Sequence, residues 1–214
     1  MKNVCWLFVF ALLVSCSSTS QKVEPFSSVN YASANMGALT GKSRIVQKPT
    51  LIKLGIQPLT LVEARGYMYN LFNALIPDLE KTNITYQMAG NDILLTIQSH
   101  ILLDENMNII PSIKPQLDNI IKLLAINNRN FIEIVGHTSS VGPSYDNLIK
   151  SKNMAISVAK YFMDRNIIPE RIFMTGMGES HWIADNSTRE GRLLNHRIEI
   201  RISPLISEKS PKLG

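Results

Sequence analysis

The pattern of apolar and polar residues predicts an ordered region that begins near Pro58. Three ranges place apolar residues at the spacing of an amphipathic helix, namely 59–75, 113–125 and 144–165. We expect Pro77 to end the first of these helices, and a further short helix over 188–194. Five ranges alternate or form short apolar runs as strands do, namely 84–88, 93–97, 131–135, 171–175 and 197–202.

The order of these elements predicts a fold class. Ala89-Gly90-Asn91-Asp92 separates the first two strands with turn residues, which indicates an antiparallel hairpin. Strands separated by long helices are expected to pair in parallel, whereas the last strand follows without a long helix and is open to antiparallel pairing. The sequence therefore predicts an α+β sandwich of order β-α-β-α-β-β, with a mixed sheet, helices on one face, and an extra helix and strand before it.

The start of the chain has the features of an export signal. Lys2 precedes an apolar run over residues 6–14, which is too short to span a bilayer and has the length of a signal-peptide core. Leu13-Val14-Ser15-Cys16 resembles a bacterial lipobox, where cleavage before the cysteine is followed by its acylation. The resemblance implies loss of residues 1–15 and a lipid anchor, such as palmitate, on Cys16. The alternative is an ordinary cleaved signal peptide with a chance cysteine.

Composition divides the rest of the chain. Serine and glycine interrupt any apolar period over residues 17–50, so we expect a flexible tether over 16–57, or a segment that docks on a partner. The predicted units that follow are an N-terminal helix and strand extension over 58–91, a folded domain over 92–203 and a frayed tail over 204–214.

Charge and chemistry exclude several classes of protein. The formal net charge of +5 is scattered without a run of like charges, which argues against a nucleic-acid partner. Cys5 leaves with the leader and Cys16 is the acylation site, so the mature domain has no thiol. The four histidines lack metal-ligand spacing, and neither a nucleophile elbow nor a phosphate loop is present. We therefore predict no catalytic residues, no metal, no cofactor and no enzymatic activity.

Two segments lie where the strand–helix units place their loops. The first runs from Gly136-His137-Thr138 to Asn147, and the second from Gly176-Met177-Gly178-Glu179 to Arg197-Ile198-Glu199. Together they resemble the OmpA-like C-terminal domain of Pal-type lipoproteins and flagellar stator proteins, over residues 92–202. The resemblance implies noncovalent binding of peptidoglycan, in a pocket for the diaminopimelate side chain of the stem peptide.

The chain departs from the family's ligand positions at three points. Ser139 stands where the family has an aspartate, Met154 where it has a helix arginine, and His196 where the last motif has its first arginine. Five residues of the implied pocket are retained: Asn106, Thr138, Asn147, Arg192 and Arg197. A purely structural role stays open for several of these, with Arg192 and Asn195 tying a loop and Arg197 lying at the surface.

Two functions remain open on this evidence. The first is a lipoprotein of the outer membrane whose periplasmic domain associates with peptidoglycan, weakened by Ser139 and Met154 because a lost charge pair costs about a few kcal/mol. The second is a structural lipoprotein of an envelope-spanning assembly, such as the outer-membrane core of a type IVB secretion system, without wall binding. Other envelope proteins are expected partners, and the loop residue Trp182 is either packed on the domain or an anchor for such a partner.

Overall fold

A computed structural model describes residues 41–207, so the predicted signal peptide, the acylation site Cys16 and the first part of the tether lie outside the described residues. The helices are α1 (Gly41–Lys53), α2 (Leu61–Leu79), α3 (Ser99–Leu102), η1 (Pro111–Ile113), α4 (Lys114–Ile126), α5 (Ser144–Met163), η2 (Pro169–Arg171) and α6 (Arg189–Asn195). The strands are β1 (Thr85–Ala89), β2 (Asp92–Gln98), β3 (Asn130–His137), β4 (Ile172–Gly176) and β5 (Arg197–Pro204). Every predicted helix and strand is present, which confirms the α+β fold.

The strands form one mixed sheet in the order β1-β2-β5-β3-β4. β1 and β2 make the predicted hairpin, whose turn contains Gly90 at φ 66°. β5 enters between β2 and β3 and is antiparallel to both, so the parallel pairing expected of helix-linked strands occurs only between β3 and β4. Insertion of the last strand places the loop before β5 beside the loop after β3, and this brings the two sequence motifs together.

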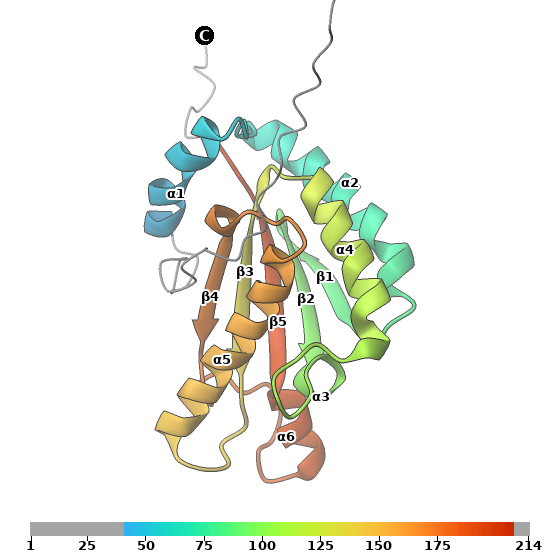
Figure 1. The fold of residues 1–214 in the computed structure, drawn as a ribbon, viewed down its shortest axis with the longest axis vertical. Helices are drawn as coiled ribbons and strands as arrows, with labels where there is room; N and C mark the ends of the chain where they lie inside the picture. The colour runs from blue at the N-terminus through green and yellow to red at the C-terminus, as the bar shows by residue number, and fades with distance from the viewer. Residues whose placement is uncertain (1–40, 208–214) are drawn as a thin grey trace, which may run out of the picture.

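Helices α2, α4 and α5 cover one face of the sheet (Figure 1). The main core lies between these helices and the sheet, and Ile132, Ile134 and Ile200 are fully buried in it. Helix α2 runs through Pro77 to Leu79, so the predicted end at Pro77 was wrong. Leu75 and Leu79 are both fully buried one turn apart, and their packing keeps the last turn helical despite the proline.

Helix α1 corrects two expectations, namely the extent of the flexible tether and the placement of the helices on one face of the sheet. Residues 41–53 are helical, so the flexible tether predicted over 16–57 was wrong for its last part. Leu51 is fully buried in a second cluster with Phe131, Phe173 and Leu205. Phe131 alternates with Ile132 along β3 and points to the opposite face, so α1 packs on the face that the other helices leave open. Serine and glycine content could not reveal this, because a contact with distant aromatic side chains stabilises the helix.

The end of the described chain is also anchored. Leu205 is fully buried, and its carbonyl accepts a 2.7 Å hydrogen bond from the amide of Leu59. The amide of Ser207 donates in turn to the carbonyl of Leu59. The predicted frayed tail was therefore wrong for residues 204–207, and residues 208–214 lie outside the description. No helix within residues 41–207 has the length and apolar character needed to cross a membrane.

Candidate functional site

Two glycines bring α5 into direct contact with the ends of β3 and β4. A Cβ built on Gly136 would lie 2.0 Å from the backbone oxygen of Ser151, and one on Gly176 would lie 2.4 Å from the backbone nitrogen of Lys152. The hydroxyl of Ser151 accepts a 2.9 Å hydrogen bond from the amide of Gly178. These positions need glycine for close approach of helix and strand, and they hold the first half of α5 against both motif loops.

The two departures at Ser139 and His196 contact each other. Ser139 is 1% exposed, and its Oγ lies 3.0 Å from Nε2 of His196. Burial lowers the pKa of His196, and the positive charge of Lys150 lowers it further, which favours the neutral imidazole. At the two positions where the resemblance predicts an acid and a base, this chain therefore has a hydrogen-bonded pair that favours neutrality.

Thr138 and Asn147 are both buried, and each forms a hydrogen bond within the domain, Thr138 through its backbone amide and Asn147 through its side chain. The amide of Thr138 donates to the carbonyl of Gly178, while its Oγ1 is buried and has no hydrogen-bond partner within the described part of the chain. Asn147 Nδ2 donates to Oε2 of Glu179 at 2.7 Å, and Ser144 donates to the other carboxylate oxygen at 2.6 Å. The hydrogen bonds from Ser144 and then Asn147 hold the pKa of Glu179 below its usual value.

Met154 lines a hollow of about 340 Å³ between α5 and the segment that follows β2. Its lining residues are Ser99, His100, Leu103, Asp104, Glu105, Met107, Lys150 and Met154. The amide of Ser99 donates to the carbonyl of His196, so the Ser139–His196 pair lies beside this hollow. A second hollow of about 430 Å³ shares Met107 and Lys150 with the first and extends it along α5.

The lining of the hollow contains charged residues of both signs. Asp104 and Glu105 line one side, and Lys150 lies on the side of α5. Sequence reasoning missed these three because Asp104 and Glu105 looked like an ordinary polar loop, and Lys150 does not occupy a family ligand position. The match of Asn106 to the family's loop asparagine was the one signal that pointed to this segment.

Asp104 gives this loop its shape. Its Oδ1 accepts hydrogen bonds from the amides of Asn106 at 2.9 Å and Asn108 at 2.8 Å. The backbone hydrogen bond from Asn108 is the largest cause of its lowered pKa. Asn106 is exposed on the rim, between the lining residues Glu105 and Met107.

Arg192 and Asn195 hold the loop before β5. Arg192 Nη1 donates to the carbonyls of Asn186 and Ser187 at 3.0 Å and 2.9 Å. Asn195 is fully buried, and its Oδ1 accepts hydrogen bonds from the amides of Ile183 and Ala184. These hydrogen bonds support the structural role left open for Arg192 and Asn195, which is to hold this loop.

Arg197 is 2% exposed, so the alternative that left it at the surface was wrong. Its Nε donates to Oε1 of Glu199 at 2.8 Å, and its Nη1 donates to the carbonyl of His181 at 3.0 Å. His137 Nε2 lies 3.7 Å from Glu199, which is too long for a hydrogen bond and is an ion pair only when the imidazole is protonated. His137 and Arg197 together lower the pKa of Glu199 to about 2. The loop that contains His181 covers this polar cluster, and Arg197 holds it there.

Comparison with known proteins agrees with this geometry. Residues 104–196 match the model of the OmpA family. This segment is an OmpA family domain. The chain is 28% identical over 142 residues to the probable lipoprotein YiaD of Escherichia coli, covering 65% of each chain. It is 35% identical over 72 residues to the peptidoglycan-binding protein ArfA of Mycobacterium tuberculosis, covering 34% of this chain and 22% of ArfA.

A solved structure shows the same fold. The putative MotB-like protein of Desulfovibrio vulgaris superposes on the OmpA-like domain and its surroundings with a TM-score of 0.59 at 22% identity. The match covers 69% of this chain and 98% of that protein. By contrast, the chain spans 65% or less of the length of the two curated relatives named above. No group of three or more potential metal-ligating side chains occurs within residues 41–207.

Proposed function

We propose that this chain is a lipid-anchored protein of the outer membrane whose OmpA-like domain associates noncovalently with peptidoglycan in the periplasm. The observation that carries the proposal is the hollow beside Met154, which is the one expected pocket residue in its lining, and the lining has both acidic and basic groups. A diaminopimelate side chain has an ammonium group and a carboxylate, and such a lining offers a partner of opposite charge for each. The names of YiaD and ArfA, a lipoprotein and a peptidoglycan-binding protein, agree with the proposal.

Binding is expected to be weaker than in family members with the usual acid and arginine. Ser139 and His196 bind each other, and Met154 offers neither a charge nor a hydrogen bond. Lys150, Asp104 and Glu105 are exposed, so water screens any ion pair that they form with a ligand. Association, rather than catalysis, is the role that these groups support.

Sedimentation with purified peptidoglycan sacculi tests the pocket. We expect weak binding by the native chain and an increase of about tenfold in the variant Ser139→Asp/Met154→Arg, because a restored charge pair in a partly desolvated site contributes about 1.4 kcal/mol or more. The matched control Ser140→Asp/Asn128→Arg adds the same two charges at exposed positions and should bind as the native chain does. An unchanged affinity in a pocket variant that melts at the native temperature would contradict the assignment of the pocket.

The lipid anchor has its own test. Cys16→Ser removes the acylation site without touching a described residue, and we expect it to release the protein from the membrane fraction of the producing cells. Unchanged fractionation with membranes would remove the anchor from the proposal. The sacculus experiment is independent of this result, since it uses purified protein.

A structural subunit of an envelope-spanning assembly is the second candidate, and one observation favours it. Large apolar side chains are exposed in the loop between β4 and α6, where Trp182 is 62% and Ile183 is 60% exposed. Exposed aromatic and aliphatic groups of this size often mark protein interfaces. Crosslinking in intact cells should identify a protein partner at these residues if this reading is right, and sacculi should then retain neither the native chain nor the pocket variant.

A further inference from the structure

The outward face of α1 is apolar. Leu51 anchors the helix to the sheet, which turns Ile45 and Ile52 to solvent with exposures of 59% and 39%. These two residues are seven positions apart and therefore share one face of the helix. Val46 is 63% exposed beside them, and Pro49 is also exposed. The described part of the chain places no side chain over this face.

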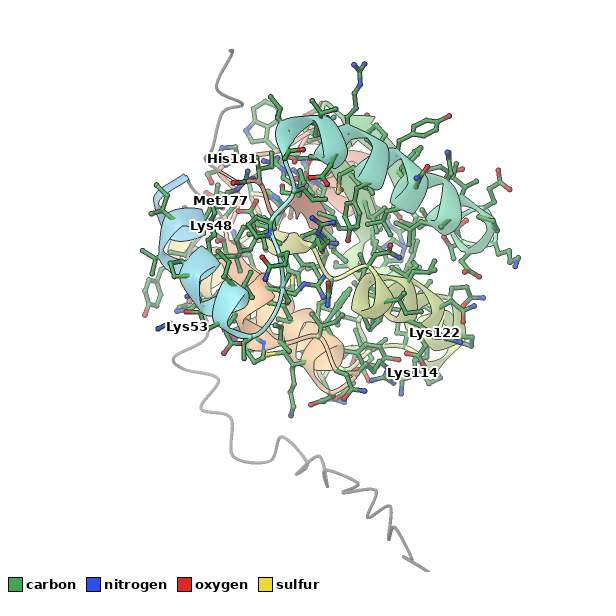
Figure 2. The ribbon with its side chains drawn as sticks, turned by 90° about the horizontal axis from the view of Figure 1, so that it is seen from above. Lys48, Lys53, Lys114, Lys122, Met177 and His181 are labelled. Carbon is green, nitrogen blue, oxygen red and sulfur yellow. The ribbon has the colours of Figure 1, made fainter. Side chains whose placement is uncertain are left out.

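Basic residues accompany this apolar face along α1, and Glu170 of the neighbouring η2 is an acidic residue of the element that packs against this helix. Arg44, Lys48 and Lys53 lie on α1, and the sequence has no aspartate or glutamate from residue 25 to residue 62. Figure 2 shows Lys48 and Lys53 along α1 on one side of the molecule, with Lys114 and Lys122 along α4 on the other. An exposed apolar strip bordered by cations is the pattern of a helix that lies in the interface of an anionic membrane.

The position of α1 gives this pattern a consequence. α1 lies toward one end of the long axis of the molecule, and α3, whose Ser99 and His100 line the hollow, lies toward the other end (Figure 1). A surface that held α1 would leave the hollow open on the far side. Gly41, the first residue of α1, follows the proposed anchor Cys16 by 25 residues.

We propose that α1 docks on the anionic headgroups of the anchoring membrane and so turns the hollow of the OmpA-like domain toward the cell wall. The inference rests on the proposed function for the presence of the membrane, and it adds the surface and the orientation. The basic residues of α1 and the negative charge of the headgroups are complementary, and this favours a membrane as the partner of α1. A second copy of the chain would bring like charges together across a helix of 13 residues, whose face is far smaller than the roughly 800 Å² per partner of a stable interface.

Vesicle flotation tests the docking surface. The protein is the mature chain from residue 16 with Cys16→Ser, so that no acyl chain contributes to binding. We expect it to float with vesicles of phosphatidylethanolamine and phosphatidylglycerol at low ionic strength, and to stay in the lower fractions with phosphatidylcholine alone. Ile45→Ser/Ile52→Ser and Lys53→Glu should each lower the partition coefficient about tenfold. Lys122→Glu, at an exposed lysine of α4, is the matched charge control and should change it by less than about twofold.

Three results would overturn the proposal. The first is no flotation of the unacylated native chain, and the second is equal loss in Lys53→Glu and Lys122→Glu, which would indicate a general charge effect. The third is a dimer in analytical ultracentrifugation that Ile45→Ser/Ile52→Ser dissociates while vesicles bind nothing, which would make a second copy the occupant. Sacculus binding is measured separately on the same protein, so loss of the wall function and loss of membrane docking are distinguishable.

Discussion

The hydroxyl of Ser139 lies 3.0 Å from Nε2 of His196, and each of these residues stands where the resemblance to the OmpA-like domain predicts a charged residue. The two substitutions are compatible with each other because one follows β3 and the other precedes β5, and these strands are neighbours. A serine beside a lone arginine would leave an unbalanced charge in a half-buried place. As a pair they satisfy each other without an ion.

The contact predicts how His196 titrates. Replacing Ser139→Asp puts a carboxylate next to the imidazole and stabilises its protonated form, so the pKa of His196 should rise from its lowered value to above the ordinary 6.5. NMR titration of the histidine ring resonances measures this change. Ser140→Asp is the control, because Ser140 is exposed and its amide binds Asn186 instead. A titration of His196 that is the same in both variants would mean that the contact does not exist in solution.

The approach of α5 to the sheet predicts opposite effects for two glycines. Gly136→Ala directs a methyl group at the backbone oxygen of Ser151, which cannot move aside as a side chain would, and should lower the free energy of unfolding by about 3 kcal/mol. Gly66→Ala meets no atom within 4 Å on the exposed side of α2 and should raise it by about 0.5–1 kcal/mol. Urea denaturation measures both values. Equal effects of the two substitutions would contradict the close approach of helix and strand.

The docking of α1 predicts a contrast between neighbouring residues. Leu51→Ala removes a fully buried side chain and should weaken the attachment of α1 by about 3 kcal/mol, whereas Ile52→Ala, on the exposed face, should cost about 0.5 kcal/mol or less. Amide hydrogen exchange across residues 41–53 measures the attachment directly. Rapid exchange of this segment in the native chain, or no difference between the two variants, would count against a docked helix.

The cluster around Glu199 predicts a loss of stability in acid. His137 and Arg197 lower the pKa of this carboxyl from 4.5 to about 2, so its contribution is complete above pH 4.5 and is lost as the pH falls from 4.5 toward 2. Allowing for solvent screening of a partly exposed carboxylate, and for the long 3.7 Å contact with His137, the contribution is about 1 kcal/mol.

Thermal unfolding from pH 7 to pH 2 measures this contribution of Glu199. Glu199→Gln should lower stability at neutral pH and flatten its decline in acid, because Arg197 then stays buried without its carboxylate. Glu190→Gln, at an exposed position, should follow the native curve. A native slope in Glu199→Gln would show that other carboxylates are responsible.

The sequence was sufficient for the elements and for the family resemblance. Each predicted strand and helix rests on a local period, and the hairpin at Gly90 needs only the residues beside it. The segments Gly136-His137-Thr138 and Asn195-His196-Arg197 identified the motif loops, and their spacing indicated the departures at Ser139, Met154 and His196. The contacts of those three residues could not be predicted, since spacing along the chain does not give the partner of a side chain.

Local pattern by itself thus determined the types and order of the elements, because a helical or a strand period is a property of neighbouring residues. Only the tertiary structure decided that β5 lies between β2 and β3, that Leu51 turns part of a serine-rich segment into a docked helix, and that Arg197 is buried against Glu199. It also decided that Lys150 and Asp104 line the hollow of Met154. Each of these depends on contacts between residues far apart in the chain, whose free energy no local pattern contains.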